Sequence, residues 1–232
     1  MDISLLSKIP EPAEEVTFCI ELLAPISMVS EAPGSFYKTL RHPDKQILCG
    51  LFENILGWHF SREDRTAIIK DVEKKRKEQK LPFSKITSRS AFLPLLMEYF
   101  ELEKVEIHAA DESLFFYNDL WKRAYRRKDS GKTHSGGTLN IDYSLVIDKH
   151  IKYQNEGLNR DAFLLENIDK VSYFYTTPTN REYLTFNGEY HCMMKMDKVL
   201  VWLLESALEQ ANNGYLGNSE GWVSMNLLKS KQ

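Results

Sequence analysis

The stretch that decides the fold runs from Tyr183 to Asn212 and reads YLTFNGEYHCMMKMDKVLVWLLESALEQAN. In its first half, apolar flanks surround Asn187-Gly188, a dipeptide typical of a two-residue hairpin turn. Asp197 stands where the N-cap of a following helix is expected. The apolar face of that helix comprises Leu200, Leu203, Leu204, Ala207 and Leu208. The stretch therefore predicts two strands joined by a hairpin turn over Tyr183–Met196, followed directly by a helix.

The elements on both sides extend this pattern. Beyond the helix, Gly214–Gly221 predicts a glycine-rich turn and Trp222–Leu228 predicts a last strand. Near the N-terminus, Val16–Ala24 predicts a buried strand that ends at Pro25. Asp44 is the expected N-cap of another helix, whose apolar face comprises Ile47, Leu51, Ile55 and Trp58.

The middle of the chain is less regular. Ser61–Lys80 is strongly charged and predicts an exposed helix whose lysines and arginines form a solvated face. Ser90–Phe100, broken by Pro94, predicts a short irregular segment, and Lys104–Ala109 alternates as a strand does. The remaining predictions are a mobile loop at 121–137, strands at Thr138–Asp148 and Val171–Thr176, and a short helix at Leu158–Lys170.

This order of elements predicts an α+β fold. It fits a ferredoxin-like (RNA-recognition-motif-like) βαββαβ domain with a large insertion or thumb. No linker cleanly splits the chain, so residues 1–232 are interpreted as a single domain, with the inserted helical and thumb region at about 60–137.

Composition limits the classes of function. The formal net charge is −3, so the chain as a whole is not a basic coat for nucleic acid, and local clusters must supply any such site. The three cysteines, Cys19, Cys49 and Cys192, form no CxxC pair, and we expect them to be small buried hydrophobes. No metal-site pattern, cofactor motif, signal peptide or membrane-spanning run is visible. We therefore expect a cytoplasmic protein without a cofactor, a metal or membrane contact.

Basic and aromatic side chains occur together in two segments. This pattern suits single-stranded RNA, because cations hold phosphates while bases stack on rings. The first segment comprises Ser35, Phe36, Tyr37, Lys38, Arg41 and His42. The second is the most basic window of the chain and comprises Lys122, Arg123, Arg126, Arg127, Lys128 and Lys132. A surface loop with one aromatic in the core, or a solvated loop without a ligand, would explain the same compositions.

Two further features are candidate RNA contacts. Gly214, Gly217 and Gly221 would let backbone N–H groups approach phosphate closely, although a plain helix-to-strand connection explains them equally well. Arg181 could reach phosphate, or it could pair with Glu182 or Glu189.

Catalytic chemistry has weaker support. Metal-independent RNA cleavage needs a general base and a cation near the reacting phosphate. His42 with Lys38 and Tyr37, or His134 with Lys132, could supply them, but nothing in the sequence fixes two histidines together. We therefore expect a binding protein with no catalytic residues. Two alternatives stay open, a metal-independent endoribonuclease and a protein–protein adaptor without RNA contact.

Several motifs, in the same order along the chain, resemble the fifth family of CRISPR-associated (Cas) proteins. A helix motif of the form xxGLLExILG is matched by Gly50, Leu51, Glu53, Ile55, Leu56 and Gly57. A P-x-x-REYL motif is matched by Pro178 and by Arg181–Leu184, and the closing glycine-rich turn is also similar. Between about residues 60 and 170 we recognise no motif of the family.

The resemblance implies a ferredoxin-like fold of the repeat-associated RNA-binding superfamily. It also implies a non-catalytic subunit of a type I Cascade complex that binds and caps the 5′ handle of the CRISPR RNA. Its neighbours would be the backbone subunit that coats the guide and the large subunit that reads target DNA, and the basic window would be a thumb that grips the handle or a neighbour. Relatives of subtype I-C are endoribonucleases, but this sequence has no clear match to their Tyr-Lys-His arrangement.

Overall fold

The computed structural model describes residues 3–29, 36–81, 92–110, 114–121, 124–125, 174–175, 179–218 and 220–229. The chain forms two compact units, which we describe one at a time. The first combines Met1–Asp119 with Arg181–Gln232, and the second is Leu120–Asn180. The predicted single domain with an insertion at about 60–137 stays a prediction.

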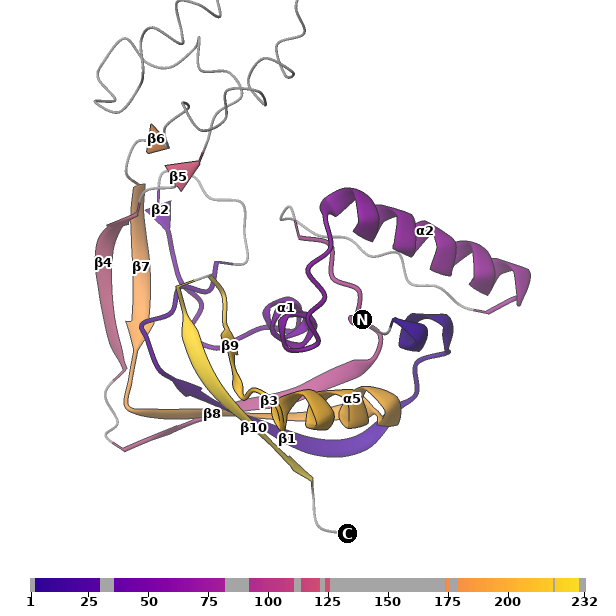
Figure 1. The fold of residues 1–232 in the computed structure, drawn as a ribbon. Coiled ribbons are helices and arrows are strands. Elements are labelled where there is room, and N and C mark those ends of the chain that lie inside the picture. Colours follow the sequence, from indigo (N-terminus) through magenta and orange to yellow (C-terminus); the bar gives the residue numbers. More distant parts are fainter. Residues whose placement is uncertain are drawn as a thin grey trace, which may run out of the picture. The chain divides into compact units, whose positions relative to one another are not determined.

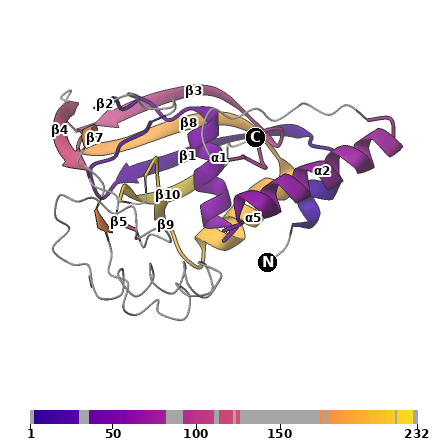
Figure 2. The same ribbon diagram turned by 90° about the horizontal axis from the view of Figure 1, so that it is seen from above.

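A five-stranded sheet forms the base of the first unit (Figures 1 and 2). Its strand order is β3-β8-β1-β10-β9, and all four pairings are antiparallel. The strands are β1 (Pro12–Leu22), β3 (Phe100–Ala109), β8 (Gly188–Asp197), β9 (Asn213–Tyr215) and β10 (Trp222–Lys229). The predicted α+β class is thus confirmed, with an antiparallel sheet. The short strand β9 was not predicted, because its sequence resembles a turn and pairing with β10 decides its conformation.

Two helices connect these strands and close the core from one side. Helix α1 (Lys45–Ile55) lies between β1 and β3 in the chain, and α5 (Lys198–Leu208) lies between β8 and β10. Both predicted N-caps are confirmed, because Asp44 accepts from the Ile47 N–H at 2.8 Å and Asp197 accepts from the Val199 N–H at 2.8 Å.

The core between sheet and helices is rich in aromatic rings. The Phe52 ring of α1 meets Phe18 of β1 at 5.0 Å and Phe100 of β3 at 5.1 Å, both edge to face. Leu200 and Leu204 of α5 are completely buried in the same core. Buried residues alternate along both inner strands, such as Phe18 and Ile20 in β1 and Tyr190 and Cys192 in β8. The five-stranded sheet therefore has one apolar face.

The charged helix is more buried than predicted. Helix α2 (Arg62–Glu78) begins at the N-cap Ser61, which accepts from the Asp64 N–H at 3.1 Å. A fully solvated face was predicted, yet Arg65 and Arg76 are each only 7% exposed. Arg76 forms an ion pair with Glu98 at 2.5 Å. The prediction was wrong here because long cationic side chains can be buried where a carboxylate neutralises them, which periodicity alone does not reveal.

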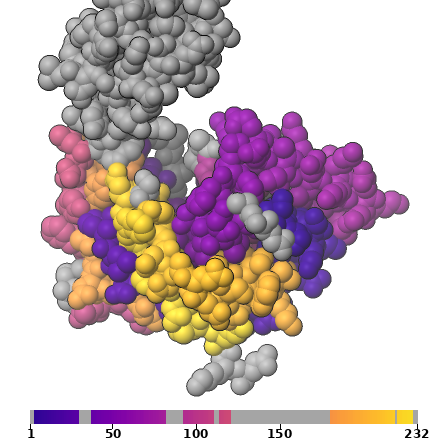
Figure 3. Space-filling model, in the orientation of Figure 1, coloured from indigo at the N-terminus to yellow at the C-terminus, as the bar shows by residue number. Residues whose placement is uncertain are grey.

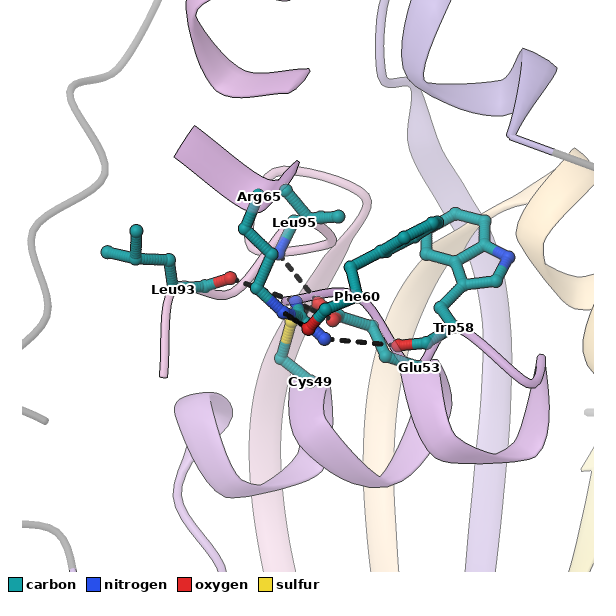
Figure 4. A network of polar contacts seen from close by, with 7 residues as sticks. All are labelled: Cys49, Glu53, Trp58, Phe60, Arg65, Leu93 and Leu95. Carbon is teal, nitrogen blue, oxygen red and sulfur yellow. Dashed lines mark hydrogen bonds and ion pairs between the residues drawn. The ribbon is translucent and has the colours of Figure 1, made fainter. Parts of the chain in front are cut away.

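Glu53, part of the helix motif in α1, lies at the centre of the buried polar network in Figure 4. Its carboxylate is paired with the Arg65 guanidinium of α2 and accepts from the Leu95 N–H at 2.6 Å. Arg65 also donates to the carbonyl oxygens of Trp58 at 3.1 Å and Leu93 at 3.0 Å. The glutamate of this motif therefore joins α1, α2 and the segment before β3.

A second sheet of the first unit has the order β2-β7-β4. It comprises β2 (Phe36–Tyr37), β7 (Thr179–Thr185) and β4 (Phe115–Trp121). In Figure 1, β8 turns sharply into β7, so that one strand belongs to each sheet. The predicted hairpin at Asn187-Gly188 is therefore wrong.

The corner at Asn187-Gly188 has a steric cause. Gly188 has a φ of +149°, and a Cβ there would lie 2.1 Å from the His108 carbonyl oxygen. Only glycine allows this close approach of β8 to β3. Because Ala110 donates to the Asn187 carbonyl at 2.9 Å, the β3–β8 pair holds together up to the corner.

The second unit is described only over a two-stranded pairing. Strand β5 (Ala124–Tyr125) is antiparallel to β6 (Phe174–Tyr175). The strand predicted at Thr138–Asp148 and the helix predicted at Leu158–Lys170 lie outside the described residues.

Candidate nucleic-acid interface

A row of aromatic rings and one guanidinium crosses the β2-β7-β4 sheet. The Arg181 guanidinium of β7 lies over the Tyr37 ring of β2, 4.9 Å from its centroid. Two residues further along β7, the Tyr183 ring stacks on Tyr117 of β4 with centroids 5.5 Å apart. Tyr117 in turn stacks on Phe115 at 6.0 Å, and Phe115 is 61% exposed. The row thus ends in an accessible ring.

Two tyrosines of this row, Tyr117 and Tyr183, keep their protons at neutral pH. Burial, followed by the charge of Asp119, raises the pKa of Tyr117 above its ordinary value. Burial, followed by the charge of Glu220, raises the pKa of Tyr183. Both hydroxyls can therefore donate hydrogen bonds to an anion while their rings stack.

Strand β7 holds the backbone of the segment before α1, which contains the basic and aromatic residues Tyr37, Lys38, Arg41 and His42. The Thr39 N–H donates to the Glu182 carboxylate at 3.1 Å, and the Thr39 hydroxyl accepts from the Met28 N–H at 2.9 Å. Leu184 pairs with Ile26 on the same stretch of backbone. Within the REYL motif, Arg181 and Tyr183 thus join the aromatic row, while Glu182 and Leu184 hold the loop.

Two cations of the loop are accessible. Lys38 and Arg41 are exposed, and the Arg41 carbonyl accepts from the buried Tyr190 hydroxyl at 3.0 Å. The His42 ring meets Tyr190 edge to face at 6.4 Å. Burial, followed by the charge of Arg41, lowers the pKa of His42, so its imidazole is neutral at pH 7.

The glycine-rich turn lies against the same backbone. Gly217 has a φ of +79°, and a Cβ on it would lie 2.6 Å from the Ser27 carbonyl oxygen. A Cβ on Gly221 would lie 2.5 Å from the Leu216 carbonyl oxygen. At Gly214 a Cβ would meet the Met225 side chain at 3.0 Å. Tight packing within the protein is therefore sufficient reason for glycine at Gly217 and Gly221.

The predicted site residues thus separate into two groups. Around the Ile26–Met28 backbone or the adjoining β2-β7-β4 sheet lie Tyr37, Lys38, Arg41, His42, Arg181, Gly217 and Gly221. Gly214 lies apart from them, in β9 against Met225 and α1. Phe36 lies in β2. Outside the described residues lie Ser35, Lys122, Arg123, Arg126, Arg127, Lys128 and Lys132.

Sequence reasoning missed the aromatic residues of β4. Phe115 and Phe116 are exposed, and Tyr117 is part of the aromatic row. The available signal was the run Phe115-Phe116-Tyr117, which precedes the most basic window of the chain by a few residues. The role of Glu182 depends on a contact between residues 143 positions apart, which no local pattern shows.

The outer face of the five-stranded sheet is unsuited to phosphate. Glu21 of β1 lies opposite Glu189 of β8, and Glu15 lies opposite Lys195. Glu106 of β3 lies opposite His191. This excess of carboxylates would repel an RNA backbone, so within the described part of the first unit the aromatic row and the exposed loop cations are the more favourable surface.

The fold and this surface define the class of protein. It is an α+β protein with an antiparallel sheet and a candidate nucleic-acid interface made of aromatic rings and cations. Comparison with protein families is more specific, because the family model described as CRISPR-associated protein Cas5p matches residues 1–227. The chain belongs to this family, and the resemblance seen in its sequence motifs is confirmed. No curated protein matches the sequence.

Two of the similar solved structures are distant likenesses. A chain of a structure titled "Cryo-EM structure of the Type III-B Cmr-beta bound to cognate target RNA and AMPPnP, state 1" has 13% identity and a TM-score of 0.38. A chain of a second structure, titled "Cryo-EM structure of the Type III-B Cmr-beta bound to cognate target RNA", has 13% identity and a TM-score of 0.36. In both, the match covers 93% of this chain and 64% of the other, so this chain spans less than two thirds of their length. Among the described residues, no helix is long and apolar enough to cross a membrane.

Proposed function

We propose that this chain is a non-catalytic subunit of a type I CRISPR Cascade complex in the cytoplasm. It binds and caps the 5′ handle of the CRISPR RNA, and it contacts the backbone subunit and the large subunit near the target DNA. The observation that carries this proposal is the convergence of the REYL motif, the Tyr37–His42 loop and the glycine-rich turn on one stretch of backbone.

The topology supports the proposal. Without the short edge strand β9, the five-stranded sheet has the order β3-β8-β1-β10, with α1 after β1 and α5 after β8. This is the order of a ferredoxin-like βαββαβ domain, in which the third and fourth strands flank the first. The basic window, which we propose as the thumb, lies in the chain between β4 and β7.

The chemistry of the site suits single-stranded RNA. Splayed bases stack on exposed rings such as Phe115, at about 1–3 kcal/mol per base. Lys38 and Arg41 hold phosphates by charge. Because Glu182 holds Thr39 and Leu184 holds Ile26 before RNA arrives, less ordering entropy opposes binding at these residues.

The test is a gel assay of the purified chain with a labelled precursor CRISPR RNA in EDTA, scored for shift and for cleavage. We expect a salt-sensitive shift without a cut. Lys38→Ala together with Arg41→Ala is expected to weaken binding roughly tenfold and to lower the salt slope by about 0.7 for each phosphate contact removed.

The matched control is Lys77→Ala, which removes a 72% exposed lysine of α2 and should leave the affinity unchanged. A specific cut in the repeat would replace the proposal with the endoribonuclease alternative. No shift, either alone or in the co-expressed complex, would favour the adaptor without RNA contact.

A further inference from the structure

Cys19 is buried, but it lies outside the hydrophobic core. Phe18 and Ile20, its neighbours in β1, point into that core, and so do the other two cysteines, Cys49 and Cys192. Cys19 lies between Phe18 and Ile20 in β1, so its side chain points to the opposite face of the sheet, where it is only 4% exposed. The predicted burial of all three cysteines is confirmed, but the neighbours of Cys19 on this face are polar.

Two potential metal ligands surround the Cys19 thiol. His191 of β8 is directly opposite Cys19 in the antiparallel register, and Glu189 lies two residues away on the same face of β8. The ligand atoms of Cys19, Glu189 and His191 all lie within 4.8 Å of one another. His191 and Glu189 already contact each other at 2.5 Å.

The backbone holds these three residues in place. Strands β1 and β8 are paired over most of their length and are flanked by β10 and β3, so both are interior strands. The His108 ring of β3 stacks on His191 with centroids 3.9 Å apart and planes inclined by 20°, which restricts the orientation of the His191 ring. His108 in turn contacts the Glu106 carboxylate at 3.4 Å.

A cavity gives access to the cluster. It has a volume of about 600 Å³, and Cys19 and Glu189 belong to its lining. Glu21, Glu205 and Glu209 also line it. Glu205 is paired with Lys229 at 2.8 Å, and the other carboxylates make the cavity attractive to cations. Figure 3 shows α5 and β10, which supply much of the lining, next to each other on the surface.

We propose that Cys19, His191 and Glu189 bind a divalent transition-metal ion of the Zn²⁺ class, with the cavity side left for a fourth ligand. Thiolate, imidazole and carboxylate form a donor set that suits Zn²⁺ better than Mg²⁺ or Ca²⁺. Bonds of about 2.0–2.3 Å put the donor atoms of a tetrahedral site roughly 3.3–3.8 Å apart, so small rotations of the three side chains close the site. His108 is a positioning residue for the His191 ring. The inference is independent of RNA binding.

The experiment is a titration of the purified full chain, first made metal-free, with Co²⁺ followed by competition with Zn²⁺. We expect one equivalent of Co²⁺ to give a thiolate-to-cobalt charge-transfer band in the near ultraviolet, and Zn²⁺ to displace it. His191→Ala should weaken binding by more than the 10–100-fold that is typical of residues neighbouring metal ligands. Cys19→Ser should abolish the band.

Two further variants keep the test decisive. Glu189→Gln changes a side chain that is 42% exposed, so the fold is retained while the affinity falls and the band remains. His59→Ala, which removes an exposed histidine far from the cluster in sequence, should change nothing. No band in the wild-type chain, or a band that persists in Cys19→Ser, would overturn the proposal. RNA binding in the gel assay would be unaffected by either outcome.

Discussion

At the scale of single residues, Glu53 belongs to the helix motif of the family and also stabilises the core. Its carboxylate is 1% exposed and neutralises Arg65, so Glu53→Gln leaves a buried guanidinium without its counter-charge. We expect the free energy of unfolding to fall by about 3–5 kcal/mol in urea denaturation, the range for breaking a buried ion pair. The matched control is Glu73→Gln, which breaks the exposed pair with Lys77 on α2 and should cost at most about 0.5 kcal/mol. Equal losses in the two variants would show that Glu53 has no special role.

At the scale of elements, the glycine-rich turn depends on close backbone packing. Gly217→Ala places a Cβ in the left-handed region and 2.6 Å from the Ser27 carbonyl oxygen, which is backbone and cannot rotate away. We expect a loss of about 1–3 kcal/mol, and a Tm lower by roughly 2–4 °C for each kcal/mol, measured by thermal unfolding. Gly50→Ala is the control, because its Cβ would lie 3.7 Å from the Phe92 ring in the middle of α1. This change should stabilise the protein by about 0.5–1 kcal/mol, and a Gly217→Ala variant as stable as Gly50→Ala would contradict the steric account.

At the scale of the whole molecule, the chain leaves and re-enters the first unit through the paired strands β4 and β7. Because Tyr117 and Tyr183 stack across this pair, a short Asn-Gly turn in place of Leu120–Asn180 should close it without disturbing the core. We expect this deletion variant to unfold cooperatively, as followed by circular dichroism, and to bind RNA with a smaller salt slope, because the basic window is gone. A variant that aggregates, or whose salt slope equals that of the full chain, would show that the two units are not separable in this way.

The sequence alone determined the class of fold, the family, both N-caps at Asp44 and Asp197, and the strand β10. These features depend on local periodicity, capping chemistry and short motifs, which can be recognised within a few residues of sequence. Tertiary structure alone decided that the strands beside Gly188 belong to different sheets, and that Arg65 and Arg76 are buried. It alone brought Cys19 next to His191, and Thr39 next to Glu182. Each of these depends on which distant segment lies opposite, and the free energy of a pairing or of a buried charge is set by that partner rather than by the sequence around it.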